Sequence, residues 1–251
     1  RTNDKRQPFP EEVNRRIASQ VADIHLAPTS WAADNLKTEG VPEESVYVTG
    51  NTVIDALHWI LNKNEQSPSE DVRDISDWLD SNTGTNPFVL ITGHRRESFG
   101  QGFENICLAI AELAEKDTNI HWIYPVHLNP NVQEPVNRIL EKYQNIHLIP
   151  PQSYSSFAWL MNRCKFILTD SGGVQEEAPS LGKHVLVMRN TTERPEGIHA
   201  GMVNLVGNEK ENIISHCERL LNSNDEDLPK ASPYGDGKAS ERILAVLKKI
   251  L

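Results

Sequence analysis

The sequence is poor in cysteine and has no long apolar run, and both absences narrow the class of protein. Its three cysteines, Cys107, Cys164 and Cys217, are odd in number, lie far apart, and each stands in an apolar helical pattern. We therefore expect reduced core thiols in a cytosolic compartment rather than disulfides or metal ligands. No stretch approaches the roughly 20 apolar residues of a membrane span, and the N-terminus lacks the apolar core of a signal peptide. These features predict a cytoplasmic protein without a membrane segment.

Basic residues are also in the minority. The chain has 25 Lys and Arg against 35 Asp and Glu, a formal net charge of -10 over 251 residues. Its overall field would repel nucleic acid and anionic membranes, although a local basic cluster still suits a small anion. The sequence contains no G-x-G-x-x-G or GK[ST] phosphate motif and no cluster with zinc-ligand spacing. Nucleic acid is therefore not an expected partner, and no metal site is predicted.

Short apolar runs, many of them β-branched, are the main structural signal. Six of them are too short for helices and are bounded by Gly, Pro, Asn or Asp; they begin at Phe88, Ile120, Ile146, Phe166, His184 and Met202. Helical patterns separate consecutive runs, and a further one follows the last. Strict alternation of this kind predicts an α/β fold with a doubly wound, Rossmann-like, mostly parallel sheet over residues 51–230. Ligands of such sheets bind at the carboxyl ends of the strands.

The first 50 residues have a different character. A helical pattern beginning at Pro10 leads into a short strand ending near Ala27, a capped helix ends at Gly40, and "SVYVTGN" reads as a second strand. These elements make too little sheet to stand alone, so residues 1–50 are expected to be the last part of a preceding Rossmann-like domain. The chain also begins at Arg1, within an expected loop, which suggests a piece of a longer protein. Residues 231–251 hold an amphipathic helix that is expected to pack back on that first domain.

The segment "LTDSGGVQEEAPSLGK" carries the clearest anion-binding signal. A strand runs into Ser171, Gly172 and Gly173 and then into a helix, so backbone N–H groups and the positive helix end point into the crevice above the sheet. The two glycines allow close approach of a phosphate. Glu177, a turn further on with Glu176, suits hydrogen bonds from sugar hydroxyls, which together predicts a nucleotide. The alternative is a helix start whose acidic residues favour the dipole by about 0.3 to 1 kcal/mol each.

Ionisable residues follow the first two strands of the sheet. "TGHRRESFG" places His94 and Arg95 at one strand end, where a histidine can contact phosphate or move a proton and an arginine can bind phosphate oxygens in pairs. "YPVHLNP" places His127 at the next. The alternatives are a solvated turn with salt bridges and a structural histidine.

Three further stretches offer candidate residues. "MRNTTERPEG" supplies Arg189 and Arg194, which suit a clamp on a pyrophosphate, although surface charge pairing explains them equally. "PPQSYSSFAWL" supplies Gln152 and Phe157 for an aromatic base, although such a phenylalanine is more often part of the core. "PFPEE" supplies Glu11, which a helix start also explains.

Taken together, four motifs carry a family resemblance. The stretches "TGHRRESFG", "YPVHLNPNV", "LTDSGGVQEEAPSLGK" and "MRNTTERPEG", in this order and spacing, resemble the non-hydrolysing UDP-N-acetylglucosamine 2-epimerases of bacteria. The likeness extends from "RTNDKRQPFPEEVNR" to "PYGDG". It implies a GT-B-type fold of two Rossmann-like domains, interconversion of UDP-GlcNAc and UDP-ManNAc by elimination and re-addition of UDP, no redox cofactor, and a homodimer.

The resemblance also implies roles for individual residues. Ser171, Gly172 and Gly173 would hold the phosphates, Glu177 the ribose, and Gln152 and Phe157 the uracil, with Arg194 near the nucleotide. His94 would contact the departing pyrophosphate or assist proton transfer, and Glu11 would act at the reacting sugar. Arg95 and His127 match positions implicated in binding a second UDP-GlcNAc as an allosteric activator.

Three rival functions stay open at this point. They are a hydrolysing 2-epimerase that releases ManNAc and UDP, a GT-B glycosyltransferase, and a nucleotide-sugar-binding module without catalysis. The opening part of the first domain, whose loops carry part of the family's catalytic set, is missing from the 251 residues. We therefore expect the chain alone to bind UDP weakly and to turn over little or nothing.

Overall fold

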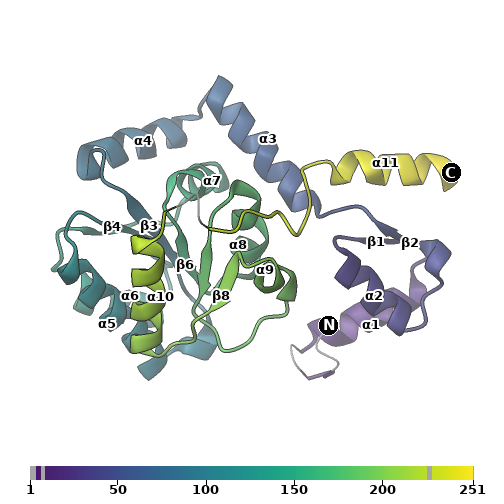
Figure 1. Ribbon diagram of the computed structural model, residues 1–251, viewed down its shortest axis with the longest axis horizontal. Coiled ribbons are helices and arrows are strands. Elements are labelled where there is room, and N and C mark those ends of the chain that lie inside the picture. Colours follow the sequence, from purple (N-terminus) through teal and green to yellow (C-terminus); the bar gives the residue numbers. More distant parts are fainter. Residues whose placement is uncertain (1–3, 7–8, 225–227, 251) are drawn as a thin grey trace. The chain divides into compact units, whose positions relative to one another are not determined.

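The computed structural model describes residues 4–6, 9–224 and 228–250 (Figure 1). Residues 1–3, 7 and 8, which belong to the first predicted segment, lie outside this range. The chain divides into two compact units: unit 1 is Arg1–His58 with Ser232–Leu251, and unit 2 is Trp59–Ala231. The sequence placed these boundaries at 50/51 and 230/231. The C-terminal segment and the N-terminal segment thus belong to one unit.

Unit 2 is built on a six-stranded sheet in which every strand pair is parallel. All six predicted strands are confirmed, as β3 (Phe88–Thr92), β4 (His121–Pro125), β5 (Ile146–Ile149), β6 (Ile167–Thr169), β7 (Val185–Val187) and β8 (Val203–Leu205). The central strands are buried along almost their whole length, which explains why they read as continuous apolar runs.

The strand order of this sheet, β5-β4-β3-β6-β7-β8, sets the position of the ligand crevice. β3 pairs with β4 through Leu90 and Ile123, and with β6 through Leu90 and Ile167. Successive strands are added outward on one side of β3 and then, from β6, on the other. This is the Rossmann order, whose switch point lies between β3 and β6.

Helices connect the strands, and most were predicted. The predicted ones are α5 (Gln101–Lys116), α6 (Pro130–Leu140), α7 (Tyr154–Arg163), α8 (Gly172–Glu177) with the 3-10 helix η3 (Ala178–Leu181), and α10 (Lys210–Asn222). The sequence did not single out α4 (Glu70–Thr83), the 3-10 helix η2 (Arg96–Ser98) or α9 (Pro195–His199). Pro195 at the first position of α9 starts a helix within a stretch read as a loop. No helix in the described ranges is long and apolar enough to cross a membrane.

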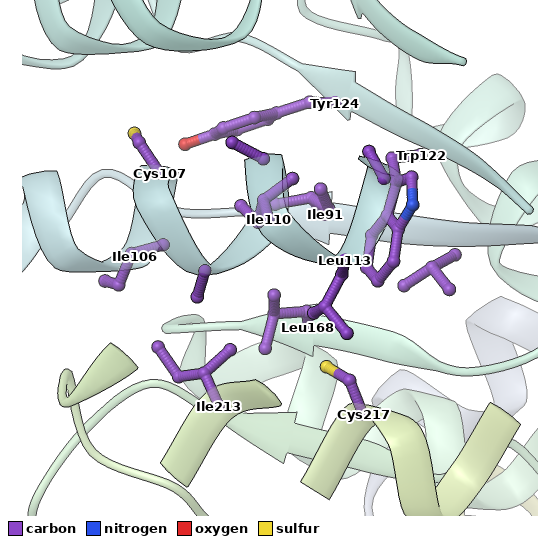
Figure 2. Packing of buried hydrophobic residues seen from close by; sticks show 14 of the residues in the cluster. Ile91, Ile106, Cys107, Ile110, Leu113, Trp122, Tyr124, Leu168, Ile213 and Cys217 are labelled. Carbon is purple, nitrogen blue, oxygen red and sulfur yellow. The ribbon is translucent and has the colours of Figure 1, made fainter. Parts of the chain in front are cut away.

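The core of unit 2 lies where α5 and α10 pack on one face of the sheet (Figure 2). Ile106 and Ile110 of α5, spaced four apart, present one apolar stripe to the strands. Ile213 and Cys217 of α10 approach Leu168 of β6 in the same view. All three cysteines are buried and unbonded, as predicted, and burial raises the pKa of the Cys107 thiol to about 12. They are core residues and not nucleophiles.

Unit 1 contains a two-stranded parallel sheet, β1 (His25–Ala27) with β2 (Val46–Val48), in the register His25 to Val46. Its helices are α1 (Glu11–Val21), α2 (Ser30–Thr38), the 3-10 helix η1 (Glu43–Ser45), the first part of α3 (Thr52–Gln66) and α11 (Ala239–Ile250). The Asp55 carboxylate accepts the backbone N–H groups of Ala239 (3.0 Å) and Ser240 (2.7 Å), so it caps the start of α11. This contact joins α3 to the C-terminal helix within unit 1.

Candidate functional site

The loops that follow β3 and β6 meet at Asp170. Its carboxylate oxygen Oδ2 accepts the backbone N–H groups of His94 and Arg95, each at 2.7 Å. Arg95 Nε donates in turn to the Asp170 carbonyl oxygen at 3.0 Å. Asp170 is only 1% exposed. It therefore joins two loops at the switch point of the sheet, where a ligand crevice is expected.

His94 lies beside His127, as the positions of β3 and β4 predict. Their rings stack with centroids 5.0 Å apart and planes 12° from parallel. The His127 Nδ1 atom accepts the backbone N–H of Asn129 at 3.1 Å, so His127 holds its proton on Nε2. Both side chains are on the surface of the loop layer.

The Ser171-Gly172-Gly173 segment follows β6 and starts α8. Ser171 is the N-cap residue, and its side chain makes no capping hydrogen bond. The Ser171 backbone N–H donates to Thr169 Oγ1 at 2.9 Å. The first N–H groups of a helix have no partner within it, so those of Gly172 and Gly173 suit an anion. Gln175, fully buried in α8, donates its side-chain amide to the Ser171 carbonyl oxygen at 3.0 Å and fixes the turn.

Arg194 covers Gly172. A Cβ atom added at Gly172 would lie 2.7 Å from the Arg194 Cζ atom, so the guanidinium rests directly on the glycine backbone. Arg194 Nε also donates to Glu176 Oε1 at 2.5 Å, and its NH1 pairs with Glu193. Arg194 and the Ser171-Gly172-Gly173 turn are thus close together, and the charge pairing given as the alternative explanation is present too. Binding of a phosphate by them stays a prediction.

The ion pairs at this loop extend to Arg189, which contacts Glu193 at 3.3 Å and Glu97 at 2.6 Å. Burial alone would raise the pKa of Glu193, but a backbone hydrogen bond and the guanidiniums of Arg194 and Arg189 lower it to about 2. Burial would lower the pKa of Arg194, but Glu176 and Glu193 raise it. Glu193 and Arg194 are therefore both charged at neutral pH.

Glu177 is 7% exposed and accepts the Tyr154 hydroxyl on Oε1 at 2.7 Å. Its other oxygen, Oε2, faces Gly173, where an added Cβ would lie 3.8 Å away. Burial raises the pKa of the Glu177 carboxyl, Tyr154 partly offsets this, and Glu176 adds to it. Burial and Glu177 likewise raise the pKa of the Tyr154 hydroxyl. The bond also holds the first turn of α7 beside α8.

Comparison with known proteins decides the family. The model of the family described as UDP-N-acetylglucosamine 2-epimerase matches residues 1–248. The chain belongs to the UDP-N-acetylglucosamine 2-epimerase family. The Salmonella typhimurium protein named UDP-N-acetylglucosamine 2-epimerase is 51% identical over 99% of this chain, which spans 66% of that relative.

Solved structures agree with this family. The Neisseria meningitidis UDP-GlcNAc 2-epimerase, bound to UDP-GlcNAc, is 44% identical with a TM-score of 0.88, over 99% of this chain and 67% of that one. The Staphylococcus aureus MnaA–UDP co-structure is 42% identical with a TM-score of 0.89, over 100% of this chain and 67% of that one. The predicted α/β fold of GT-B type is thereby confirmed.

Two further residues expected from the family resemblance lie next to the first turn of α7. Gln152 precedes the helix and donates its side-chain amide to the Pro150 carbonyl oxygen at 2.7 Å. Phe157 lies within α7 and is partly buried. They flank Tyr154, whose bond to Glu177 ties this turn to the phosphate loop. Their contact with a uracil stays a prediction.

Glu11, the remaining 2-epimerase candidate, belongs to unit 1. It is exposed in the first turn of α1. Its neighbour Glu12 is fully buried and pairs with Arg15 and Arg16, each at 3.4 Å. Both carboxylates stand in the "PFPEE" stretch, and the sequence alone does not indicate that Glu12 is buried whereas Glu11 is exposed. The role of Glu11 at the sugar stays a prediction.

Sequence reasoning missed Asp170, Tyr154 and Gln175 as parts of this site. Asp170 could have been found, because an acidic residue directly after a buried strand and before a phosphate loop lies at the ligand edge of the sheet. Tyr154 and Gln175 act through contacts between different elements, which no local pattern encodes. Within the described residues, no group of three or more His, Cys, Asp or Glu is placed to hold a metal ion.

Proposed function

We propose that this chain forms the nucleotide-binding part of an enzyme that interconverts UDP-GlcNAc and UDP-ManNAc. Family membership supports the proposal, as do relatives of known structure bound to UDP-GlcNAc and to UDP. The observation that carries it is the Ser171-Gly172-Gly173 turn at the switch point, with no side-chain cap and with Arg194 against Gly172. A diphosphate is the ligand that fits such a turn.

The nucleotide would lie across the carboxyl ends of β6 and β5. The backbone N–H groups of the turn bind the phosphates, and Arg194 adds a charged donor once it turns from its carboxylate partners. Glu177 offers Oε2 to the ribose hydroxyls while Tyr154 holds Oε1. Gln152 and Phe157, which flank Tyr154 in the sequence, are proposed to contact the uracil.

The reaction is an elimination followed by re-addition. A carboxylate removes the C2 proton, the C2–H electron pair forms the C1=C2 bond, and the C1–O electron pair leaves with the β-phosphate of UDP. UDP then adds back to C1, and a proton returns to C2 on the opposite face. Turn N–H groups and Arg194 stabilise the charge on the departing phosphate, and His94 supplies a proton there. Glu11 is the proposed carboxylate at the sugar.

The proposal extends to regulation and assembly. Arg95 and His127 lie beside His94 at the same edge of the sheet. They are proposed to bind a second UDP-GlcNAc as an activator, and the enzyme is proposed to be a cytoplasmic homodimer that needs no redox cofactor. Exchange of either residue for Ala should then abolish activation by excess UDP-GlcNAc while UDP binding at the phosphate turn persists.

A calorimetric titration with UDP tests the nucleotide site. Saturable one-site binding by the chain, lost in Glu177→Ala and kept in the matched surface variant Glu218→Ala, is expected. Glu218 is an exposed glutamate that pairs with Lys116 away from this site. A folded chain that does not bind UDP, or one that binds equally well without Glu177, would contradict the placement.

Product analysis tests the reaction. UDP-GlcNAc is incubated in D₂O with the chain, and with a fusion that adds the third of the Salmonella relative which the match leaves uncovered. With the fusion we expect UDP-ManNAc and UDP-GlcNAc that carry deuterium at C2, because elimination exchanges that proton with solvent, and with the chain alone we expect little or no product. Free ManNAc with UDP would instead indicate a hydrolysing enzyme, and sugar transfer to an added acceptor a glycosyltransferase. Binding without any turnover by the fusion would favour a non-catalytic module.

A further inference from the structure

Only one of the two oxygen atoms of the Asp170 carboxylate accepts hydrogen bonds within the described residues. Oδ2 accepts two backbone N–H groups at 2.7 Å. Within the part of the chain that the structure describes, Oδ1 is buried and has no hydrogen-bond partner. A buried carboxylate oxygen without a donor is unfavourable, because it has lost its water and gained no hydrogen bond in return. We therefore expect Asp170 Oδ1 to accept a hydrogen bond in some conformation of the protein.

The donor in reach is the His94 imidazole. Its Nδ1 atom lies 3.8 Å from Asp170 Oδ1. That is about 1 Å longer than a charge-assisted hydrogen bond, which measures roughly 2.7–2.9 Å. The His94 side chain is 44% exposed, so a small rotation of the ring is free to close the gap.

The other contacts of the loop leave this pairing open. His127 stacks on the His94 ring, and its Nδ1 atom accepts the backbone N–H of Asn129. The Arg95 guanidinium binds the carbonyl oxygen of Asp170 rather than its carboxylate. Below the loop, the Tyr124 hydroxyl donates to the Gly93 carbonyl oxygen at 2.9 Å and fixes the backbone that precedes His94.

We propose that Asp170 is the positioning residue for His94, accepting Nδ1–H on Oδ1 so that Nε2 faces the nucleotide. This inference rests on the proposed function and deepens it. Two backbone N–H groups lock the carboxylate, and the carboxylate then selects one tautomer and one orientation of the ring, as the acid does in Ser-His-Asp triads. No local motif predicts the pairing, since 76 positions separate the two residues.

The pairing gives His94 a defined task in the elimination. A protonated ring donates Nε2–H to the β-phosphate oxygen as the C1–O bond breaks, and the same nitrogen takes the proton back when UDP adds to C1. The Asp170 carboxylate faces the imidazolium and stabilises its charge. Asp170 itself touches neither substrate nor the reacting atoms.

The test is Asp170→Asn in the 251-residue chain. The amide oxygen can still accept the two backbone N–H groups, while the amide nitrogen would face His94 Nδ1 as a donor and force it to be an acceptor. Imidazole ¹⁵N NMR reads the tautomer at a pH where the ring is neutral. We expect Nδ1–H in the wild-type chain and Nε2–H in Asp170→Asn. Turnover of UDP-GlcNAc, where present, should fall about 100-fold or more in kcat with little change in KM.

Tyr124→Phe is the matched control. It removes the hydrogen bond to Gly93 from the same loop without touching the imidazole, so its His94 tautomer should remain that of the wild type. An Nε2–H tautomer in the wild-type chain would overturn the proposal, even if Asp170→Asn does not fold. So would an unchanged tautomer in a folded Asp170→Asn chain. Because the tautomer is read without substrate, failure of the epimerase proposal would appear separately, as loss of UDP binding or turnover in the wild type.

Discussion

Replacing Gly172 by Ala should separate the ligand-binding role of Arg194 from its contribution to stability. The new Cβ would lie 2.7 Å from Cζ, 2.8 Å from NH1 and 2.9 Å from NH2 of Arg194. Ordinary carbon contacts are about 3.5–4.0 Å, so the guanidinium must move by about 1 Å. Its 2.5 Å bond from Nε to Glu176 would then lengthen to the limit of hydrogen bonding.

The expected loss of stability is small. Each partly exposed ion pair of Arg194 contributes about 1 kcal/mol or less. Alanine at a helical position gains about 1 kcal/mol over glycine, which offsets most of that loss. The guanidinium is also the end of a flexible side chain, so its displacement strains little else. We expect the free energy of unfolding, measured in urea, to change by no more than about 1 kcal/mol.

The expected loss of UDP affinity is larger. A hydrogen bond between charged groups contributes about 1.5 to 3 kcal/mol, which corresponds to roughly a 10- to 150-fold change in Kd when Arg194 is displaced from the phosphates. Calorimetry on Gly172→Ala, Arg194→Ala and the double variant checks the mechanism. If the methyl group acts through Arg194, the double variant should bind UDP as Arg194→Ala does. Additive losses would refute this reasoning, as would wild-type affinity in Gly172→Ala.

Three further variants test the surrounding contacts. Tyr154→Phe removes the donor to Glu177 Oε1, so the pKa of Glu177 should rise further and UDP affinity measured at pH 6 should fall about 10-fold. Ion pairing depresses the folded-state pKa of Glu193 to about 2, so in the wild type this carboxylate stabilises the fold above its ordinary pKa of 4.5, and the stabilisation is lost as the pH falls towards about 2. Glu193→Gln should remove this contribution. Urea unfolding at pH 6 and at pH 3 measures the difference between the two proteins. Asn145→Ala removes the side-chain hydrogen bonds to the carbonyl oxygens of Ala114 and Ile120. It should lower the free energy of unfolding by about 2 to 4 kcal/mol. An unchanged urea midpoint would show that these bonds contribute nothing.

The sheet of unit 2 was predictable because burial on both faces leaves a direct mark on the sequence. "FVLIT" and "FILTD" are apolar because β3 and β6 lie at the centre of a parallel sheet, and the alternation with helices implies the crevice between them. The same logic places His94 and Ser171 at the carboxyl-terminal edge of the sheet from the sequence alone. The positions of the strands along the chain and of the loops that follow them can therefore be predicted from local sequence, whereas the order of the strands in the sheet comes from the structure.

The pairing of side chains at the site was not predictable. Glu176 and Glu177 are adjacent and chemically identical, yet one pairs with Arg194 and the other is buried against Tyr154. Glu11 and Glu12 diverge in the same way. In each case the choice depends on which side chain another element presents, and helical rotation turns neighbouring residues in different directions. Spacing alone does not contain that information.

The carboxylates beside the phosphate turn are explained by the arginine they hold. Glu97, Glu193 and Glu176 alternate with Arg189 and Arg194, so three negative charges face two positive ones and the net charge is -1. A diphosphate that binds at Gly172 must therefore draw Arg194 away from carboxylates that already satisfy it, which reduces the net gain from the new contact. For an enzyme proposed to release UDP from C1 of the sugar and add it back to C1 after the C2 proton has changed face, moderate retention of UDP is an advantage. A turn lined only by arginines without carboxylate partners would bind UDP more tightly and would slow its return to C1.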